Sequence, residues 1–291
     1  MDYNNEFKKI DSEIKAYFLG FAFADGCITT KKGKGNYIGY HFRLSLIDKE
    51  IIDKFKKEWD FFNYEEFDFS KYNAGNKIQY GIRKTNTQLY EDLKSHGLVE
   101  RKSIENSHKL LFPTISKNLI PHFIRGYFDG NGSINISAKR PNLRRIEICT
   151  TSKIFLTEIK SILEQHNVIC PIFRERKNRI TPLFVLEWIN TRDIFSLKNF
   201  FYKDCTISLT RKKEKFDSFY PIDKKENNPV CPKCFNRKVR KAGKRQMVKG
   251  LMLRYICVGC DNRFSIPAHI KQDELLENPE EDNQQPSLRS N

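Results

Sequence analysis

The chain has 291 residues, of which 39% are hydrophobic, enough to form one large core or two smaller ones. Lysine and arginine number 52 against 36 aspartate and glutamate residues, so the formal net charge is +16. This excess favours a polyanionic partner such as nucleic acid or an anionic membrane surface; a basic protein without a special partner is the alternative. No apolar run approaches the ~20 residues that span a bilayer, and the N-terminal residues lack the apolar segment of a signal peptide. We therefore expect an intracellular protein without a membrane segment.

The first predicted element is an almost entirely apolar helix, AYFLGFAFADG, at residues 16–26. It ends at Asp25, where a carboxylate faces the negative end of the helix macrodipole and is mildly unfavourable by itself. Ala16, Gly20 and Ala24 recur at four-residue intervals, which gives the helix one face of small side chains. Such a face lets a second helix approach more closely than the usual ~8–10 Å. We expect a helix–helix contact here; an ordinary core helix with incidental small residues is the alternative.

The segments that follow occur twice in the chain. YHFRLSLIDKEIIDKFKKEW from residue 40 and RRIEICTTSKIFLTEIKSIL from residue 144 share one plan, with His41 lying 104 residues before Arg145. QYGIRKTNTQLYEDLKSHG from residue 79 and LFVLEWINTRDIFSLKNFF from residue 183 keep the same spacing. The apolar helix is repeated as FIRGYFDGNG, in which Gly126 lies 106 residues after Gly20. The chain therefore contains an internal duplication.

The duplication predicts an α+β fold of two αββαββα repeats, residues 1–110 and 111–220, related by a pseudo-two-fold axis within a monomer. The small-residue helices are the natural elements to meet at that axis, because Gly126 and Gly130 give the second helix the same kind of face. Strand alternation predicts that one face of each sheet packs on helices and that the other is polar.

Two sequences carry a resemblance to a known family. FLGFAFADG at residues 18–26 and IRGYFDGNG at residues 124–132 resemble the signature of the LAGLIDADG homing endonucleases, and the duplication resembles their single-chain, two-repeat form. The resemblance covers roughly residues 10–220. It implies that the two helices pack together and that each places an acidic residue beside the minor groove of double-stranded DNA. It also implies a saddle of antiparallel sheets along the major groove, and a gene carried by a mobile element such as an intron.

The resemblance implies that Asp25 binds a divalent metal ion, which would offset the unfavourable helix dipole. Carboxylate and phosphate oxygens suit Mg²⁺, which polarises the phosphate and lowers the pKa of the attacking water. In the second copy the matching position is Asn131, which offers a neutral carbonyl oxygen, while Asp129 lies two residues earlier. Lys102 and Lys212 match the lysine that the family places near each active site, where a cation would stabilise charge on the phosphate. Surface lysines that only contact phosphates are the alternative.

These features predict a site-specific DNA endonuclease, a metal-dependent hydrolase of phosphodiester bonds. Asn131 leaves several outcomes open: unequal cleavage of the two strands, weaker metal binding, DNA binding without cleavage, or replacement by Asp129. The alternative function is a catalytically weak or inactive DNA-binding regulator, or a maturase that binds RNA.

The polar face of each predicted sheet is expected to contact DNA, since arginine suits guanine and glutamine suits adenine. Ordinary solvated strand faces are the alternative. The residues assigned to this surface are Thr29, Lys31, His41, Arg43, Lys77, Gln79, Arg83, Asn135, Ser137, Lys139, Arg145, Glu147, Arg174 and Arg176.

The eight cysteines fall into two groups. Four are scattered through apolar or strand-like sequence and are expected to be reduced thiols. The others form two C-x2-C pairs, a spacing that suits a structural four-cysteine zinc site, with a redox pair as the alternative. The predicted zinc ligands are Cys231, Cys234, Cys257 and Cys260.

Residues 229–270, which contain these ligands, resemble the zinc ribbons attached to transposases and other DNA-binding proteins. They carry ten lysine or arginine residues against one aspartate, so we expect salt-dependent phosphate contacts, with a solvated basic hairpin as the alternative. The residues assigned to these contacts are Arg240, Lys241, Lys244 and Arg245. Residues 271–291 contain six acids and two bases and are expected to form a disordered tail.

Overall fold

The computed structural model describes residues 3–35, 37–68, 78–136, 144–168, 172–176, 181–189, 191–217, 222–223, 228–234, 236, 238–247 and 250–267, and all structural statements concern these residues. The chain divides into two compact units. The first consists of Met1–Asn135 and Arg145–Lys212, and the second of Ile136–Arg144 and Lys213–Asn291. None of the described helices combines the length and the apolar character needed to cross a membrane.

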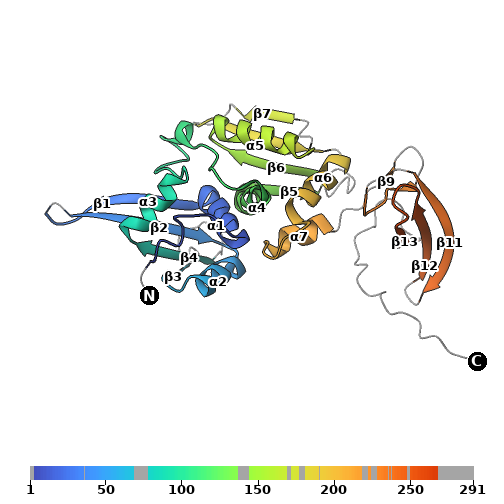
Figure 1. Ribbon diagram of the computed structural model, residues 1–291, viewed down its shortest axis with the longest axis horizontal. Coiled ribbons are helices and arrows are strands. Elements are labelled where there is room, and N and C mark those ends of the chain that lie inside the picture. Colours follow the sequence, from blue (N-terminus) through green and yellow to red (C-terminus); the bar gives the residue numbers. More distant parts are fainter. Residues whose placement is uncertain are drawn as a thin grey trace, which may run out of the picture. The chain divides into compact units, whose positions relative to one another are not determined.

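The first unit contains the predicted duplication (Figure 1). The elements of the first repeat are α1 (Glu13–Ala24), β1 (Gly26–Lys32), β2 (Ile38–Leu46), α2 (Lys49–Glu58), β3 (Asn63–Asp68), β4 (Ile78–Thr85) and α3 (Thr87–Ser95). Those of the second are α4 (Ile120–Asn131), β5 (Gly132–Ile136), β6 (Arg144–Thr150), α5 (Lys153–Gln165), β7 (Ile172–Arg176), β8 (Leu183–Trp188) and α6 (Thr191–Tyr202). The two sheets have the matching strand orders β1-β2-β4-β3 and β5-β6-β8-β7. The prediction of two αββαββα repeats with antiparallel sheets is therefore confirmed.

Short polar side chains fix where several helices begin. The Oγ of Ser12 accepts a hydrogen bond from the backbone N–H of Lys15 at 3.4 Å, at the start of α1. The Oδ1 of Asn86 accepts from Leu89 at 2.8 Å at the start of α3. Each cap satisfies a backbone donor that the first helical turn leaves unpaired.

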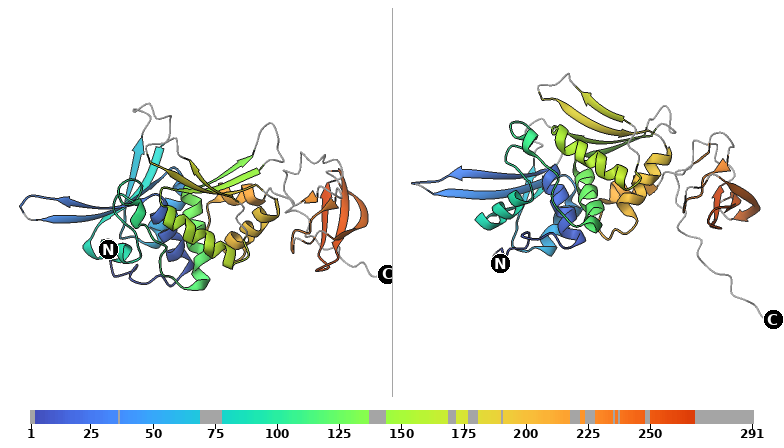
Figure 2. Two further views of the ribbon diagram at one scale, coloured as in Figure 1. Left: turned by 90° about the horizontal axis from the view of Figure 1, so that it is seen from above. Right: turned by 45° about the horizontal axis from the view of Figure 1, so that its top comes forward.

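The sheets place their apolar face against the helices, as the alternation predicts. In β2, Phe42, Leu44 and Leu46 are buried while Arg43 between them is exposed. The second sheet differs on its polar face, because Glu147 is only 6% exposed and Glu187 only 1%. The polar face of the second sheet therefore contains two buried glutamates. Figure 2 shows the β1–β2 hairpin extending beyond the rest of the first sheet.

The signature helices α1 and α4 pack directly on each other through their glycines. A Cβ atom on Gly20 would lie closer than 3.0 Å to backbone atoms of Phe123, Gly126 and Tyr127, and one on Gly126 would meet the backbone of Tyr17 equally closely. The contacts are reciprocal, as expected for two equivalent helices crossing at a pseudo-two-fold axis. Only glycine permits this separation, so the predicted helix contact is confirmed.

The second unit is built on a three-stranded antiparallel sheet. Its strands are β11 (Val239–Met247), β12 (Gly250–Cys257) and β13 (Arg263–Pro267), in the order β11-β12-β13. A two-stranded ladder pairs β9 (Ile222–Asp223) with β10 (Asn228–Pro229). The helix α7 (Thr210–Asp217) spans the boundary between the two units in sequence.

Candidate functional site

A pocket of about 620 Å³ lies at the C-terminal ends of α1 and α4. It brings together Asp25, Lys102 and Asn131, three of the five residues that sequence analysis assigned to catalysis. The remaining lining residues are Ala24, Gly26, Cys27, Val99, Arg101, Ser103, Ile104 and Glu105. Because the ends of both signature helices contribute to one pocket, a single ligand can contact both repeats there.

Asp25 caps the C-terminus of α1, and its backbone N–H donates to the carbonyl of Phe21 at 2.8 Å. Its side chain reaches solvent, yet the protein around it raises its pKa by burial, against the opposing charges of Lys102 and Lys212. The carboxylate packs so closely against α4 that a Cβ on Gly130 would lie 2.6 Å from Asp25 Oδ2. No hydrogen bond from a described residue satisfies this carboxylate, so it remains available to a cation in the pocket.

Lys102 and Lys212 occupy matching places in the two repeats. The Nζ of Lys102 donates to the carbonyl of Gly26, which directly follows Asp25. The Nζ of Lys212 donates to the carbonyl of Gly132, which directly follows Asn131, at 2.7 Å. The two lysines therefore both contact the end of their own signature helix.

The two lysines differ in their freedom to contact a ligand. Lys212 is 3% exposed and also donates to the carbonyls of Phe128 at 2.6 Å and Asp129 at 2.7 Å, so all three of its N–H groups are used. Burial lowers its pKa to about 8. Lys102 is half-buried and lines the pocket with two N–H groups unused, and burial lowers its pKa as well. Of the two lysines, only Lys102 can donate to a ligand in the pocket without first breaking a described hydrogen bond.

Asp129 lies in the interface between the helices and outside the pocket. It is 1% exposed, and its Oδ2 accepts hydrogen bonds from the Tyr17 hydroxyl at 2.7 Å and from the Leu209 N–H at 2.9 Å. Burial raises its pKa to about 6, although Lys212 opposes the shift. In this position Asp129 ties α4 to α1 and to the segment before α7.

Asn131 presents an amide where the first repeat has a carboxylate. Its Nδ2 donates to the hydroxyl of Tyr127 at 3.2 Å, and that hydroxyl donates to the carbonyl of Cys149 at 3.2 Å. This orientation leaves Oδ1 without a partner among the described residues. At the ends of the two signature helices the pocket therefore presents the carboxylate of Asp25 and the neutral carbonyl oxygen of Asn131.

Each lysine lies in the segment that follows the last sheet-covering helix of its repeat, α3 or α6, and this segment contacts elements of the other repeat. In the segment of Lys102, the Lys102 carbonyl accepts from the hydroxyl of Thr151 at 3.5 Å, and the N–H of Phe112 donates to Glu158 at 2.8 Å. In the segment of Lys212, Thr210 donates to Glu50 at 2.7 and 2.9 Å.

Polar groups at the start of α2 and α5 add to these contacts. Arg211 makes two bonds to Asp48, at 2.7 and 2.8 Å. Ser152 caps α5 by accepting from Phe155, and its hydroxyl donates to the carbonyl of Leu110 at 3.3 Å. Both lysine segments are thus held between the two repeats.

The arginines predicted to contact DNA in the first unit are all in ion pairs. In the first sheet, Glu65 lies 3.4 Å from Arg43 and 2.7 Å from Arg83, which face each other across β2 and β4. The side chains of Arg43 and Arg83 are 48% and 60% exposed, so the shared glutamate leaves both of them in contact with solvent. Sequence analysis missed Glu65.

The equivalent central positions of the second sheet carry opposite charge. Glu147 and Glu187 lie opposite each other, each 104 residues after Arg43 and Arg83 respectively. Their partners lie 2.6 to 2.7 Å away and are Arg145 and Arg174, which contact Glu187, and Arg176, which contacts Glu147. Sequence analysis missed Glu187. The 104-residue spacing of the duplication, applied to Arg43 and Arg83, would have identified both glutamates and the reversal of charge.

The other predicted surface residues are solvated to different degrees. His41 shares a hydrogen bond with the Thr85 hydroxyl at 2.8 Å. Thr29 and Gln79 are half-buried, while Lys31 and Asn135 are exposed. Lys77, Ser137 and Lys139 lie outside the described residues, as does Cys170.

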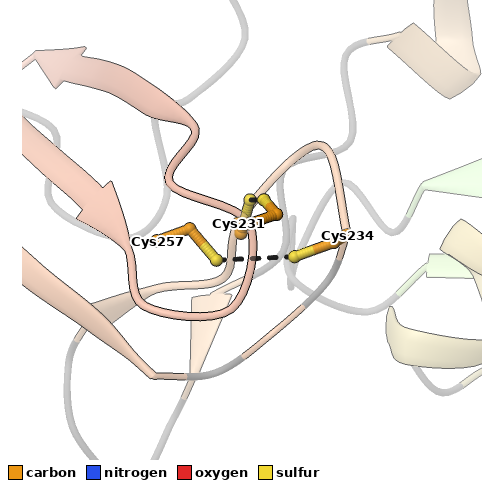
Figure 3. A group of neighbouring side chains, drawn as sticks. Cys231, Cys234 and Cys257 are labelled. Carbon is orange, nitrogen blue, oxygen red and sulfur yellow. Dashed lines mark hydrogen bonds between the residues drawn. The ribbon is translucent and has the colours of Figure 1, made fainter.

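The four predicted zinc ligands form one cluster in the second unit. The Sγ atoms of Cys231, Cys234, Cys257 and Cys260 lie within 4.8 Å of one another. Two of the separations are 3.6 Å, between Cys231 and Cys260, and 3.4 Å, between Cys234 and Cys257 (Figure 3). Thiolates around a tetrahedral zinc ion, with Zn–S bonds near 2.3 Å, lie about 3.8 Å apart. The cluster fits a structural zinc ion, and all seven described cysteines are free of disulfides.

Comparison with protein families identifies part of the chain. Residues 119–200, which run from the residue before α4 into α6, match the family of LAGLIDADG-like domains. The second repeat is therefore similar to LAGLIDADG-like domains, in agreement with the resemblance drawn from the signature helices.

The curated relatives are much longer proteins. A probable translation initiation factor IF-2 from Methanocaldococcus jannaschii is 26% identical over 241 residues, which cover 76% of this chain and 18% of the relative. The DNA-directed RNA polymerase subunit Rpo1C of the same organism is 27% identical over 168 residues, which cover 55% of this chain and 17% of that relative. The chain thus spans less than a fifth of the length of these relatives.

Solved structures with a similar course of the chain include two nucleases. The LAGLIDADG meganuclease I-AabMI bound to uncleaved DNA is 12% identical, with a TM-score of 0.48 and coverage of 72% of this chain and 89% of that one. The homing endonuclease I-DmoI in complex with DNA and Mn is 19% identical, with a TM-score of 0.43, and the match covers 64% of this chain and 93% of that one.

Proposed function

We propose that the chain is a metal-dependent DNA endonuclease that hydrolyses phosphodiester bonds within a specific duplex site. The observation that carries the proposal is the pocket shared by Asp25, Lys102 and Asn131 at the ends of two crossed helices. The LAGLIDADG-like domain at residues 119–200 supports it. In this proposal the repeats are residues 1–110 and 111–220, the zinc ribbon is residues 229–270, and the protein is an intracellular monomer encoded by a mobile element.

Asp25 and Asn131 are the residues that would hold the divalent ion. Their oxygen atoms are hard ligands of the kind that Mg²⁺ prefers, and neither side-chain oxygen is used by another described residue. When bound, the ion would polarise the scissile phosphate and lower the pKa of the attacking water. The raised pKa of Asp25 fits this assignment, because a nearby cation would favour the charged form that burial disfavours.

Lys102 would act on the phosphate itself. Its two unused N–H groups face no described acceptor, and its ammonium lies in the same pocket as Asp25. A cation there stabilises the charge that develops on the phosphate oxygens during hydrolysis. Because burial lowers its pKa, Lys102 also releases a proton to a leaving oxygen more readily than a solvated lysine.

The two repeats are chemically unequal, so we infer unequal cleavage of the two strands. The first repeat offers a carboxylate and an available lysine, whereas the second offers an amide and Lys212, whose three N–H groups are bound to carbonyls. A DNA nick would then be the first product. The same inequality favours the second candidate function, a regulator or RNA maturase of the same fold that binds without cutting.

Selection of cleaved sites from a random duplex library with Mg²⁺, and with a chelator as control, tests the proposal. Asp25→Asn should lower cleavage at least about 100-fold, while Asp53→Asn, which alters an exposed carboxylate of α2, should leave it unchanged. Asn131→Asp should raise the share of double-strand cuts. Binding that is unaffected by the chelator, without cleavage, would instead identify a regulator, and preference for RNA would identify a maturase.

A further inference from the structure

The sheet of the second unit separates its basic residues by face. Across the three strands, Arg240 pairs with Ile256 and Ile256 with Arg263, so these residues lie on one face. On the same face Arg245 pairs with Met252, and Arg254 lies midway along β12. We call the surface formed by Arg240, Arg245, Arg254 and Arg263 the arginine face.

A bulge in β11 creates this grouping. Arg240 and Arg245 are five residues apart and would lie on opposite faces of a regular strand. The register shifts between Lys241 and Lys244, where Gly243 has a φ of +101° that suits glycine. The shift returns Arg245 to the face of Arg240. Sequence analysis had grouped both arginines with Lys241 and Lys244, which the structure places on the other face.

The opposite face of this sheet carries buried side chains of the second unit. Tyr255 is 3% exposed and stacks on Phe264 with ring centroids 5.7 Å apart. Cys257, a member of the cysteine cluster, is fully buried on the same face. Lys241 and Lys244 are the basic residues of this face, and both belong to β11. This face therefore carries the small core and offers little area to a polyanion.

The arginine face carries charge that nothing in the described chain neutralises. All four arginines are exposed, and none forms an ion pair with a described acid. In the first unit, by contrast, Arg43, Arg83, Arg145, Arg174 and Arg176 are each paired with a glutamate. From strand spacing and rise, the arginine face extends about 10 Å across and about 13 Å along the strands. Arginine also binds phosphate oxygens in two-bond geometry, which lysine cannot do.

We propose that the arginine face binds the phosphate backbone of DNA, independently of its sequence, and that the lysine-bearing face does not. The inference deepens the proposed endonuclease function by assigning the second unit a backbone contact of its own. Its failure would leave the nuclease proposal standing, because the test measures binding to a duplex without the target site and needs no cleavage.

The test compares three double variants of the full, zinc-loaded chain by fluorescence anisotropy with a nonspecific duplex. Arg240→Gln/Arg245→Gln and Arg254→Gln/Arg263→Gln each remove two charges from the arginine face. Lys241→Gln/Lys244→Gln removes two charges from the same strand β11 but from the opposite face, and is the matched control. Zinc content and circular dichroism verify that each variant keeps the ribbon.

Each arginine pair is expected to lower the slope of log K against log salt by about 1.8, at about 0.9 per phosphate contact. Taking 1 M salt as the reference, this corresponds to a loss of roughly 60-fold in affinity at 0.1 M. The lysine pair should leave both quantities near those of the parent. Equal losses in the β11 variants would overturn the proposal. Unchanged binding by the arginine variants would overturn it as well, and tighter binding by a chain without residues 271–291 would then assign the face to the acidic tail.

Discussion

Replacing Gly20 with alanine tests the helix crossing on which the pocket depends. The added Cβ would lie closer than 3.0 Å to backbone atoms of Phe123, Gly126 and Tyr127, which cannot rotate away as a side chain would. Overpacking of this kind costs about 1–3 kcal/mol, and a backbone clash belongs at the upper end. Alanine returns about 1 kcal/mol through its higher helix propensity. The expected net loss is therefore about 2 kcal/mol.

This loss should lower the melting temperature by roughly 4–8 °C for a unit of this size. Urea and thermal unfolding followed by circular dichroism measure it, with Lys54→Ala on the exposed face of α2 as the control, expected within about 0.5 kcal/mol of the parent. Gly126→Ala should cost a similar amount, because its contacts with Tyr17 are reciprocal. The double variant should lose less than the sum, since one separation of the helices relieves both clashes. A Gly20→Ala variant as stable as the parent would refute the crossing.

Three further predictions concern other parts of the chain. Burial raises the pKa of Glu13, but hydrogen bonds from Thr206 and the charge of Arg125 outweigh it, so the pKa is lowered overall. The carboxylate therefore stabilises the fold at pH values above its unfolded pKa of about 4.3. Glu13→Gln should therefore lose about 1–3 kcal/mol in urea unfolding at pH 7, and the difference should vanish as the pH falls through the folded pKa; a constant difference down to pH ~3 would contradict it. Cys234→Ser should abolish binding of one zinc ion per chain in metal analysis, whereas Cys27→Ser outside the cluster should keep it; retained zinc in the first variant would exclude the four-cysteine site. Glu187→Ala should lower the unfolding free energy by about 1–2 kcal/mol, because two partly solvated arginines lose their partner, and an unchanged midpoint in urea would show that the pairs contribute nothing.

Much of the fold follows from the spacing of the duplication. Because two copies must fold alike, each ambiguous apolar run could be assigned from its counterpart, and the small residues of the signature helices indicated which elements meet. The convergence of Asp25 and Asn131 in one pocket follows from the same logic. The burial of Asp129 between the helices does not follow from the duplication. One helical turn contains both solvent-facing and interface positions, and only the crossing geometry decides which of them is buried.

The polar surfaces were less predictable for a different reason. Alternation along a strand states which residues share a face but not which charges meet across strands, so the pairing of Arg43 and Arg83 with Glu65 was missed. In β11 the alternation itself is interrupted by the bulge at Gly243, and a single glycine in a basic strand does not reveal a register shift. Long-range registers of this kind depend on the partner strand.

The contacts of the two lysine segments make the repeats mutually dependent. Lys102 is carried by a segment that docks on Thr151 and Glu158, and Lys212 by one that docks on Glu50. If one half were produced alone, its lysine segment would have no surface of the other repeat to pack against. If both halves were produced as separate polypeptides, the pocket would form only when they associate. Covalent linkage of the halves therefore ensures that each lysine segment has the surface of the other repeat to pack against.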